Sequence, residues 1–579
     1  MTVSALWSSD TGAAGVEPVD ISLVPDQVDA IDLNLETLAA QGAGPAWRAT
    51  TASAAVQAVM LAGADPAEVD LSFGITGPID GPSAGAALTV GVLALLNGAP
   101  VRSDVTVTGT VSPDGSIGPV GDVAVKVDAA AAAGMATVLV PTGSAVPGPA
   151  GVQVVEVDSV REAYRWVTGE TLVPDAAGPE SPVGEAAVGV GEARGSGEAR
   201  GNAAEEAQVA AALVSRLRDR MASASVPSDV LAVAASSLRE ANRALRAGES
   251  SRAYALAFDG YTQLERAIGD SRARAWSRRP EAAQRRTAAL LNRLIERSAA
   301  VTRTLGDWAA DDPHTALSVP VVAEMSVFAG AVLREHRADV RGSDRRPVIV
   351  AAMRAAHDQR VTLDVLVPDS MRFVGSRGAV PAGAGAAKWQ TGTAEFLHDY
   401  TELLLLAARA NDEYARTALP CADATCDRQT TAWFLRRAAR GLPGGEAGLQ
   451  EEVRDSGVAV ANYLAAAIKV ARAQAFGWYT TGVSQAEDPE SPMRSAQVDR
   501  TLAAGSASVL DSVGALESQG VGAALPAWWT RWGVASVPAL ESEGRTPAGQ
   551  VRAYRNNWHS AVSVAMLGSA VDRGLIGTG

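Results

Sequence analysis

The sequence predicts an α+β domain at the N-terminus followed by a mostly all-α helical region. Three observations carry this prediction. Residues 1–171 alternate short β-rich runs with helical runs, as in a compact domain that contains both kinds of element. Residues 172–205 are rich in Gly, Ala and Glu, a composition typical of a flexible linker. Residues 206–579 carry apolar residues at three- and four-residue spacing, which indicates helices.

Hydrophobic patterns predict the elements of the first domain. Residues 69–75 and 105–111 alternate apolar and polar side chains, as strands with one buried face do. The runs 137–140 and 152–157 predict two further strands. Helical spacing predicts four helices, near 46–63, 83–96, 122–133 and 158–168.

The second region is expected to form one or two helical domains. Gly248, Glu249 and Ser250 separate two helical runs and predict an αα-hairpin. A stretch rich in Val, Pro and Gly predicts a loop-rich break within 340–392. Helices are expected near 206–223, 228–247, 251–268, 280–306, 393–418, 446–479, 492–518 and 548–573.

Composition limits the classes of partner and compartment. The net charge of −15 favours solubility and argues against a general nucleic-acid partner. No apolar stretch approaches the roughly 18 uninterrupted residues of a membrane span. The first residues lack the basic and long apolar regions of a signal peptide. We therefore expect a cytoplasmic protein without a membrane span, unless an export signal has been trimmed.

Cysteine is scarce, and no metal site is expected. The two cysteines, Cys421 and Cys426, have no nearby His and so do not complete a four-ligand zinc site. They are either free thiols or a local disulfide, and a disulfide would suit an exported protein. No cofactor is expected.

The sharpest local motif is Asp80-Gly81-Pro82-Ser83-Ala84-Gly85, which precedes an apolar run. Proline is favoured at the first position of a helix, so we expect the helix to begin near Pro82. Ser83 would then lie at a helix N-terminus, where free backbone N–H groups could bind an oxyanion. The alternative is that Ser83 only caps the helix.

Lys126 is the candidate base for Ser83. None of the five histidines lies in the first 205 residues, which excludes a Ser-His-Asp triad within this domain. The chain has only three lysines, Lys126, Lys388 and Lys469, and the other 47 of its 50 basic residues are arginines. Lysine can act as a base when burial lowers its pKa, which arginine cannot do. A solvated surface lysine is the alternative.

Three segments together resemble the proteolytic domain of the Lon (S16) family. They are the motif around Ser83, the segment Thr108-Gly-Thr-Val-Ser-Pro-Asp-Gly-Ser-Ile-Gly-Pro-Val-Gly121 and the run from Lys126 to Pro141. The resemblance covers roughly residues 15–170. It implies that Ser83 is the nucleophile and Lys126 the general base. It also implies that Thr108 orients the lysine and that Asp80 contacts it.

The resemblance is closest to Lon-like proteases that lack a fused ATPase. Thr110 stands where full-length Lon has an acidic residue, and no G-x-x-x-x-G-K-[ST] phosphate-binding motif is found. Asp122 stands where relatives often have glycine, and we expect it to cap the helix that follows. Both departures affect rate or regulation, and neither removes Ser83 or Lys126.

The resemblance implies an endopeptidase that cuts unfolded or flexible polypeptides, alone or with a separate unfoldase. It also implies a homo-oligomeric ring, possibly a hexamer. Two alternatives remain. One is a catalytically idle Lon-like scaffold that binds partners, and the other is a protease that cleaves its own linker at 172–205.

Overall fold

The computed structural model describes residues 1–9, 11–24, 33–144, 146–172, 197–276, 280–374, 384–418, 448–473, 492–541 and 546–576. The two cysteines, most of the 172–205 segment and the side chain of Lys388 lie outside the described residues.

The N-terminal domain contains three small sheets. In the first sheet, β1 (Thr2–Ser8), β2 (Ala14–Leu23) and β3 (Leu71–Gly74) are antiparallel, with β2 in the middle. In the second sheet, β4 (Val105–Val107), β7 (Thr137–Pro141) and β8 (Gln153–Val157) are parallel. The predictions of strands at 69–75, 137–140 and 152–157 are confirmed. The sequence analysis did not identify β1 and β2.

The single strand expected at 105–111 is wrong, because the structure divides it. β4 ends at Val107, and a short strand β5 (Thr110–Val111) pairs with β6 (Ile117–Gly118) in a separate antiparallel ribbon. The break occurs at Gly109, whose backbone N–H and C=O bond the turn around Ser83 rather than a neighbouring strand. A Cβ atom at Gly109 would lie only 2.4 Å from Ile117 Cγ2, so no larger residue fits there.

The four expected helices of this domain are present: α2 (Pro45–Ala62), α3 (Gly85–Leu96), α4 (Val123–Ala132) and α5 (Val160–Thr168). A short helix, α1 (Leu35–Ala40), was not predicted. The expectation that the second of these helices begins near Pro82 is wrong, because α3 begins at Gly85 with Ala84 as its N-cap residue.

The remainder of the described chain is helical, as predicted. The αα-hairpin is confirmed, with Gly248 at a φ of +80° between α7 and α8. A helix begins at Gly197, inside the segment expected to be a linker. The predicted helices are α6 (Gly197–Ser223), α7 (Ser228–Arg246), α8 (Ser250–Trp276), α9 (Pro280–Ala309), α13 (Ala384–Ala418), α15 (Leu449–Ala473), α17 (Pro492–Ser518) and α19 (Thr546–Asp572).

Several helices were not predicted. Some are unusually apolar, and others lie where a loop-rich break was expected. Part of the loop-rich break is helical: α11 (Arg346–Val361), a π-helical turn η2 (Thr362–Leu366) and α12 (Val367–Met371) follow one another. The apolar helices α10 (Pro313–Gly342) and α18 (Ala524–Glu541) lack a clear polar face. By length and composition α10 could cross a membrane, but 83% of its most apolar window is buried inside the protein, as in a core helix.

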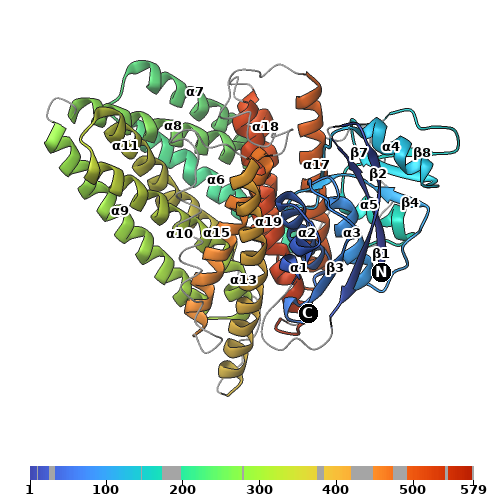
Figure 1. Ribbon diagram of the computed structural model, residues 1–579. Helices are drawn as coiled ribbons and strands as arrows, with labels where there is room; N and C mark the ends of the chain where they lie inside the picture. Colours follow the sequence, from blue (N-terminus) through green and yellow to red (C-terminus); the bar gives the residue numbers. More distant parts are fainter. Residues whose placement is uncertain are drawn as a thin grey trace.

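The helical region forms a wedge beside the α/β domain (Figure 1). The C-terminal helices α17 and α19 lie between the two, and α19 and α13 both contact α2. The largest hydrophobic core includes residues of both regions without interruption. The helical region is therefore packed onto the α/β domain through a shared core.

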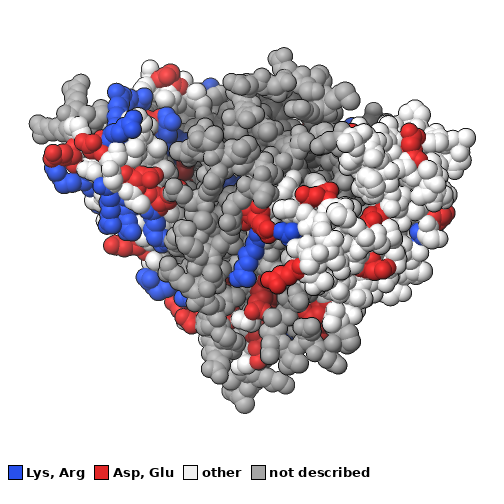
Figure 2. All heavy atoms as spheres, viewed as in Figure 1, with Lys and Arg blue, Asp and Glu red and all other residues white. Residues whose placement is uncertain are grey.

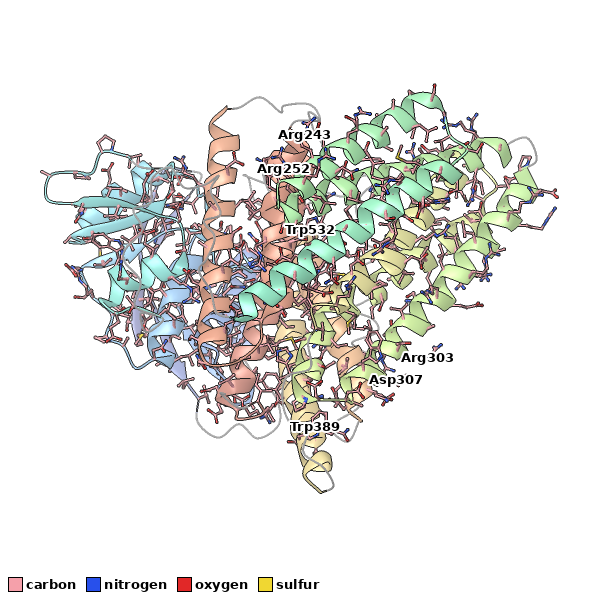
Figure 3. The ribbon with its side chains drawn as sticks, turned by 180° about the vertical axis from the view of Figure 1, so that it is seen from behind. Arg243, Arg252, Arg303, Asp307, Trp389 and Trp532 are labelled. Carbon is pink, nitrogen blue, oxygen red and sulfur yellow. The ribbon has the colours of Figure 1, made fainter. Side chains whose placement is uncertain are left out.

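An aromatic cluster occupies the inside of this wedge. Trp528, Trp529 and Trp532 of α18 are each at most 2% exposed. Trp528 and Trp532 stack with ring centroids 5.6 Å apart, and Tyr254 of α8 packs edge-on against both. Figure 3 shows Trp532 within the helical layers, whereas Arg303 lies at the surface.

The outer face of the wedge carries charges of both signs. Figure 2 shows arginine and acidic side chains interspersed over the face that contains α9, on the side away from the α/β domain. The exposed arginines of α9 are Arg285, Arg286, Arg293, Arg297 and Arg303. The described surface of the α/β domain in the same view carries few basic residues.

Candidate active site

Ser83 lies in a tight turn that two backbone segments hold in place. The Ser83 carbonyl accepts hydrogen bonds from the Gly109 N–H (2.8 Å) and the Thr108 hydroxyl (3.2 Å). The Ala86 N–H donates to the Gly109 carbonyl (2.9 Å). A Cβ atom at Gly85 would lie 3.2 Å from the Val111 nitrogen, so glycine permits this close approach. These hydrogen bonds therefore hold the Ser83 turn against the chain segment between β4 and β5.

The turn leaves the Ser83 hydroxyl available. Gly81 has a φ of +113°, a conformation that favours glycine. Since Ala84 is the N-cap residue of α3, Ser83 is not the cap, and its hydroxyl makes no hydrogen bond within the described chain. Ser83 is half-buried and lies just before the N-terminus of α3, where the helix dipole is positive.

Lys126 is almost completely buried, with 3% of its surface exposed. It lies on α4, which packs against β1, β2 and β7. Its neighbours Val123 and Val127 belong to a small apolar core with Leu6 and Val138. Burial lowers the pKa of Lys126 from 10.5 to about 8, although the Asp122 carboxylate opposes this shift. No carboxylate of the described chain forms an ion pair with Lys126. The alternative of a solvated lysine is thus excluded.

Asp122 begins α4 but does not cap it as expected. Its backbone is left-handed, with a φ of +57°, and its side chain makes no capping hydrogen bond. Instead, Asp122 Oδ2 accepts a hydrogen bond from the Ser8 hydroxyl (3.1 Å). A left-handed residue at this position explains why glycine also fits here.

Asp80 stabilises a helix start, and no ion pair joins it to Lys126 within the described chain. Its Oδ1 atom accepts hydrogen bonds from the backbone N–H groups of Trp47 and Gly81, both at 2.9 Å. Trp47 lies in the first turn of α2, whose N-cap residue Gly44 has no side chain to supply this acceptor. A Cβ atom at Gly44 would lie 2.1 Å from Asp80 Cγ, so glycine makes room for the carboxylate.

Thr108 links the Ser83 turn to the parallel sheet. It is completely buried, and its N–H donates to the Leu139 carbonyl of β7 (3.0 Å). Its hydroxyl donates to the Ser83 carbonyl, and no hydrogen bond to Lys126 is formed. Because α4 packs on β7, Thr108 connects the turn that carries Ser83 to the layer that carries Lys126.

The helical region contributes residues near this site that the sequence analysis did not find. Arg48 of α2 forms an ion pair with Glu413 of α13 (2.6 Å). Burial raises the pKa of Tyr414, and the Asp80 carboxylate raises it further. These pairs join positions more than 300 residues apart, so no local pattern could have indicated them.

The site does not contain a metal centre in the part of the chain that is described. No group of three or more His, Cys, Asp or Glu side chains there could hold a metal ion.

Comparison with known proteins identifies the segment that contains both residues. Residues 67–146 match the family described as the Lon protease (S16) C-terminal proteolytic domain. The chain is 52% identical over 64 residues to the Lon protease of Frankia alni, which covers 11% of this chain and 7% of that protein. It is 42% identical over 95 residues to the Lon protease of Paraburkholderia phytofirmans, which covers 16% of this chain and 11% of that protein.

A third relative, Lon protease 2 of Bacillus subtilis, is 36% identical over 81 residues, 14% of this chain and 15% of that protein. The chain thus spans only a small part of the length of the curated relatives that it matches. The match falls on the α/β domain and includes Asp80, Ser83, Thr108 and Lys126. Residues 67–146, which include Ser83 and Lys126, thus match the proteolytic domain of the Lon (S16) family.

Proposed function

We propose that this protein is a serine-type endopeptidase in which Ser83 is the nucleophile and Lys126 the general base. The observation that carries the proposal is the burial of Lys126 in a Lon-type domain that has no histidine. At 3% exposure and with no ion pair in the described chain, this lysine has a pKa of about 8, so half of it is neutral at that pH. A neutral amine is the state that a general base requires.

The reaction follows from these two groups. Neutral Lys126 takes the proton of the Ser83 hydroxyl as Oγ attacks the carbonyl carbon of the scissile bond. The resulting lysine ammonium then protonates the leaving amine, which leaves an acyl ester on Ser83. Water, deprotonated by Lys126, hydrolyses this ester and restores the hydroxyl.

The oxyanion would be held by backbone N–H groups of the Ser83 turn. The N–H groups of Gly85 and Ala86 already donate to the carbonyls of Pro82 and Gly109. The N–H groups of Ser83 and Ala84 have no backbone acceptor within the described chain. We assign these two as oxyanion donors, where the positive end of α3 adds to their effect.

We further propose that the substrates are unfolded or flexible polypeptides and that the protein acts in the cytoplasm without an ATPase module of its own. It would act alone or with a separate unfoldase, and it would assemble into a homo-oligomeric ring, possibly a hexamer. Light scattering of the purified chain tests the assembly, and a monomer at micromolar concentration would contradict it.

The first experiment measures degradation of a fluorescently labelled unfolded protein without nucleotide. The wild type is expected to degrade it, whereas Ser83→Ala and Lys126→Arg are expected to lose at least 1,000-fold in kcat/KM, roughly the effect of removing a nucleophile or its base. Lys388→Arg makes the same exchange at another lysine and is the matched control. Activity that survives in Ser83→Ala would refute the proposed function.

A further inference from the structure

The electrostatic surroundings of Lys126 contain few charges. The elements packed against α4 are β1, β2 and β7, and of these only β2 carries charged residues, Glu17 and Asp20. Both are engaged elsewhere: Glu17 accepts from the Thr76 hydroxyl (2.8 Å) and Asp20 from the Thr2 hydroxyl (2.6 Å). Of the charged groups around α4, the Asp122 carboxylate is the one that acts on the pKa of Lys126, against the larger influence of burial.

Asp122 lies one helical turn before Lys126 and is held in place. Its carbonyl accepts the first helical hydrogen bond, from the Lys126 N–H (3.0 Å). Its carboxylate is anchored by the Ser8 hydroxyl of β1 (3.1 Å). Because helical side chains tilt toward the N-terminus of their helix, the Lys126 side chain leans toward the start of α4, where the Asp122 carboxylate is anchored.

We propose that Asp122 is a positioning residue whose fixed carboxylate determines how readily the Lys126 ammonium gives up its proton. Its role in catalysis rests on the proposed function, but its effect on the lysine does not. A left-handed backbone accepts Gly, Asn or Asp at this position, so the charge is not needed for the fold.

The direction of the effect follows from two opposing influences on the pKa of Lys126. Burial lowers this pKa, and the Asp122 carboxylate raises it because it stabilises the ammonium. Removing the carboxylate should therefore lower the pKa of Lys126 further. For an exposed carboxylate about one helical turn away, the change in the pKa of Lys126 should be about 0.5 to 1 pH unit.

The scarcity of lysine allows a direct measurement. The full-length chain labelled with ¹³C at lysine Cε contains only three such sites, and Lys126→Arg identifies the signal of Lys126. Titration of that signal in the wild type and in Asp122→Asn gives the two pKa values. Asparagine retains an acceptor for the Ser8 hydroxyl and suits the left-handed backbone, so only the charge is removed.

The expected result is a Lys126 titration at lower pH in both Asp122→Asn and Asp122→Gly. Asp128→Asn is the matched control, because Asp128 is exposed on the same helix two residues after the lysine. Since Asp122 is also exposed, 1 M salt should reduce the difference between wild type and Asp122→Asn. An unchanged Lys126 titration in Asp122→Asn would overturn the proposal.

The pH profile of kcat/KM provides the second readout. The acidic limb of the profile should move to lower pH in Asp122→Asn, which would make the variant about 3- to 10-fold more active than wild type at pH 6.5. A merely structural role would lower activity at every pH without moving the limb. If the wild type shows no activity, the proposed function fails, while the lysine titration still decides the role of Asp122.

Discussion

Lys126 is buried and has no ion pair in the described chain, whereas the residues next to it indicated only an apolar setting. The adjacent valines and the scarcity of lysine predicted an apolar setting, and the 3% exposure of Lys126 confirms it. The sequence could not predict that α4 packs against β1, β2 and β7, which enclose the lysine. This burial lowers the pKa of Lys126 from 10.5 to about 8.

At the residue scale, we predict that kcat/KM rises with pH and reaches half of its plateau near pH 8. The base must be neutral, and the Lys126 ammonium loses its proton as pH rises through its pKa, so activity is lost on the acidic side. The measurement is peptide hydrolysis between pH 6 and 10. An activity that is constant over this range would contradict the assignment of Lys126 as base.

At the element scale, the Ser83 turn depends on segments that are distant in sequence. Gly109 interrupts the predicted strand because both of its backbone hydrogen bonds go to the turn. Asp80 supplies the acceptor that the N-terminus of α2 lacks. The motif around Ser83 was evident in the sequence, but these contacts depend on how the chain folds back on itself.

The capping role of Asp80 gives a second prediction. Asp80→Ala should lower the free energy of unfolding by about 1 kcal/mol, since Trp47 N–H loses its acceptor. Asp80→Asn keeps an acceptor oxygen and should change it by less than about 0.5 kcal/mol. Urea denaturation of the full chain measures both. Equal destabilisation by Asn and Ala would show that the charge, and not the capping oxygen, is what matters.

At the scale of the whole molecule, a buried carboxyl joins the two regions. Asp114 lies in the β5–β6 turn, is 2% exposed, and its Oδ1 accepts from the Ser116 hydroxyl (2.6 Å). Gly505 of α17 lies so close that a Cβ atom there would be 2.2 Å from Asp114 Oδ2. Within the described chain neither Asp114 Oδ2 nor Asn557 Oδ1 meets the geometry of a hydrogen bond, although the Asn557 side chain lies close enough to lower the pKa of Asp114 slightly. A proton on the carboxyl would supply the missing donor.

Burial raises the pKa of Asp114 from 3.8 to about 6, which gives a prediction for the stability of the whole chain. The folded protein retains this proton between pH 4 and 6 after the unfolded chain has lost it. The stabilisation that this retained proton provides is fully present below pH 3.8 and is lost as pH rises through 6.

Asp114→Asn remains neutral and should avoid this loss. The free energy of unfolding of Asp114→Asn minus that of the wild type should be about 2 to 3 kcal/mol larger at pH 7.5 than at pH 4. Urea denaturation at the two pH values measures the difference, and Asp70→Asn removes a carboxylate from the same domain as a control. A difference between variant and wild type that does not depend on pH would contradict the prediction.

The sequence by itself determined the elements whose patterns are local. Strands such as β3 and β7, the periodic helices and the motifs of a Lon-type proteolytic domain all depend on residues close together in the chain. The tertiary structure alone decided where β4 ends, which group caps α2, and which helices are buried over most of their length, as the apolar part of α10 is. Each of these depends on a partner that is distant in sequence, since burial and hydrogen bonding are settled by packing and leave no local pattern.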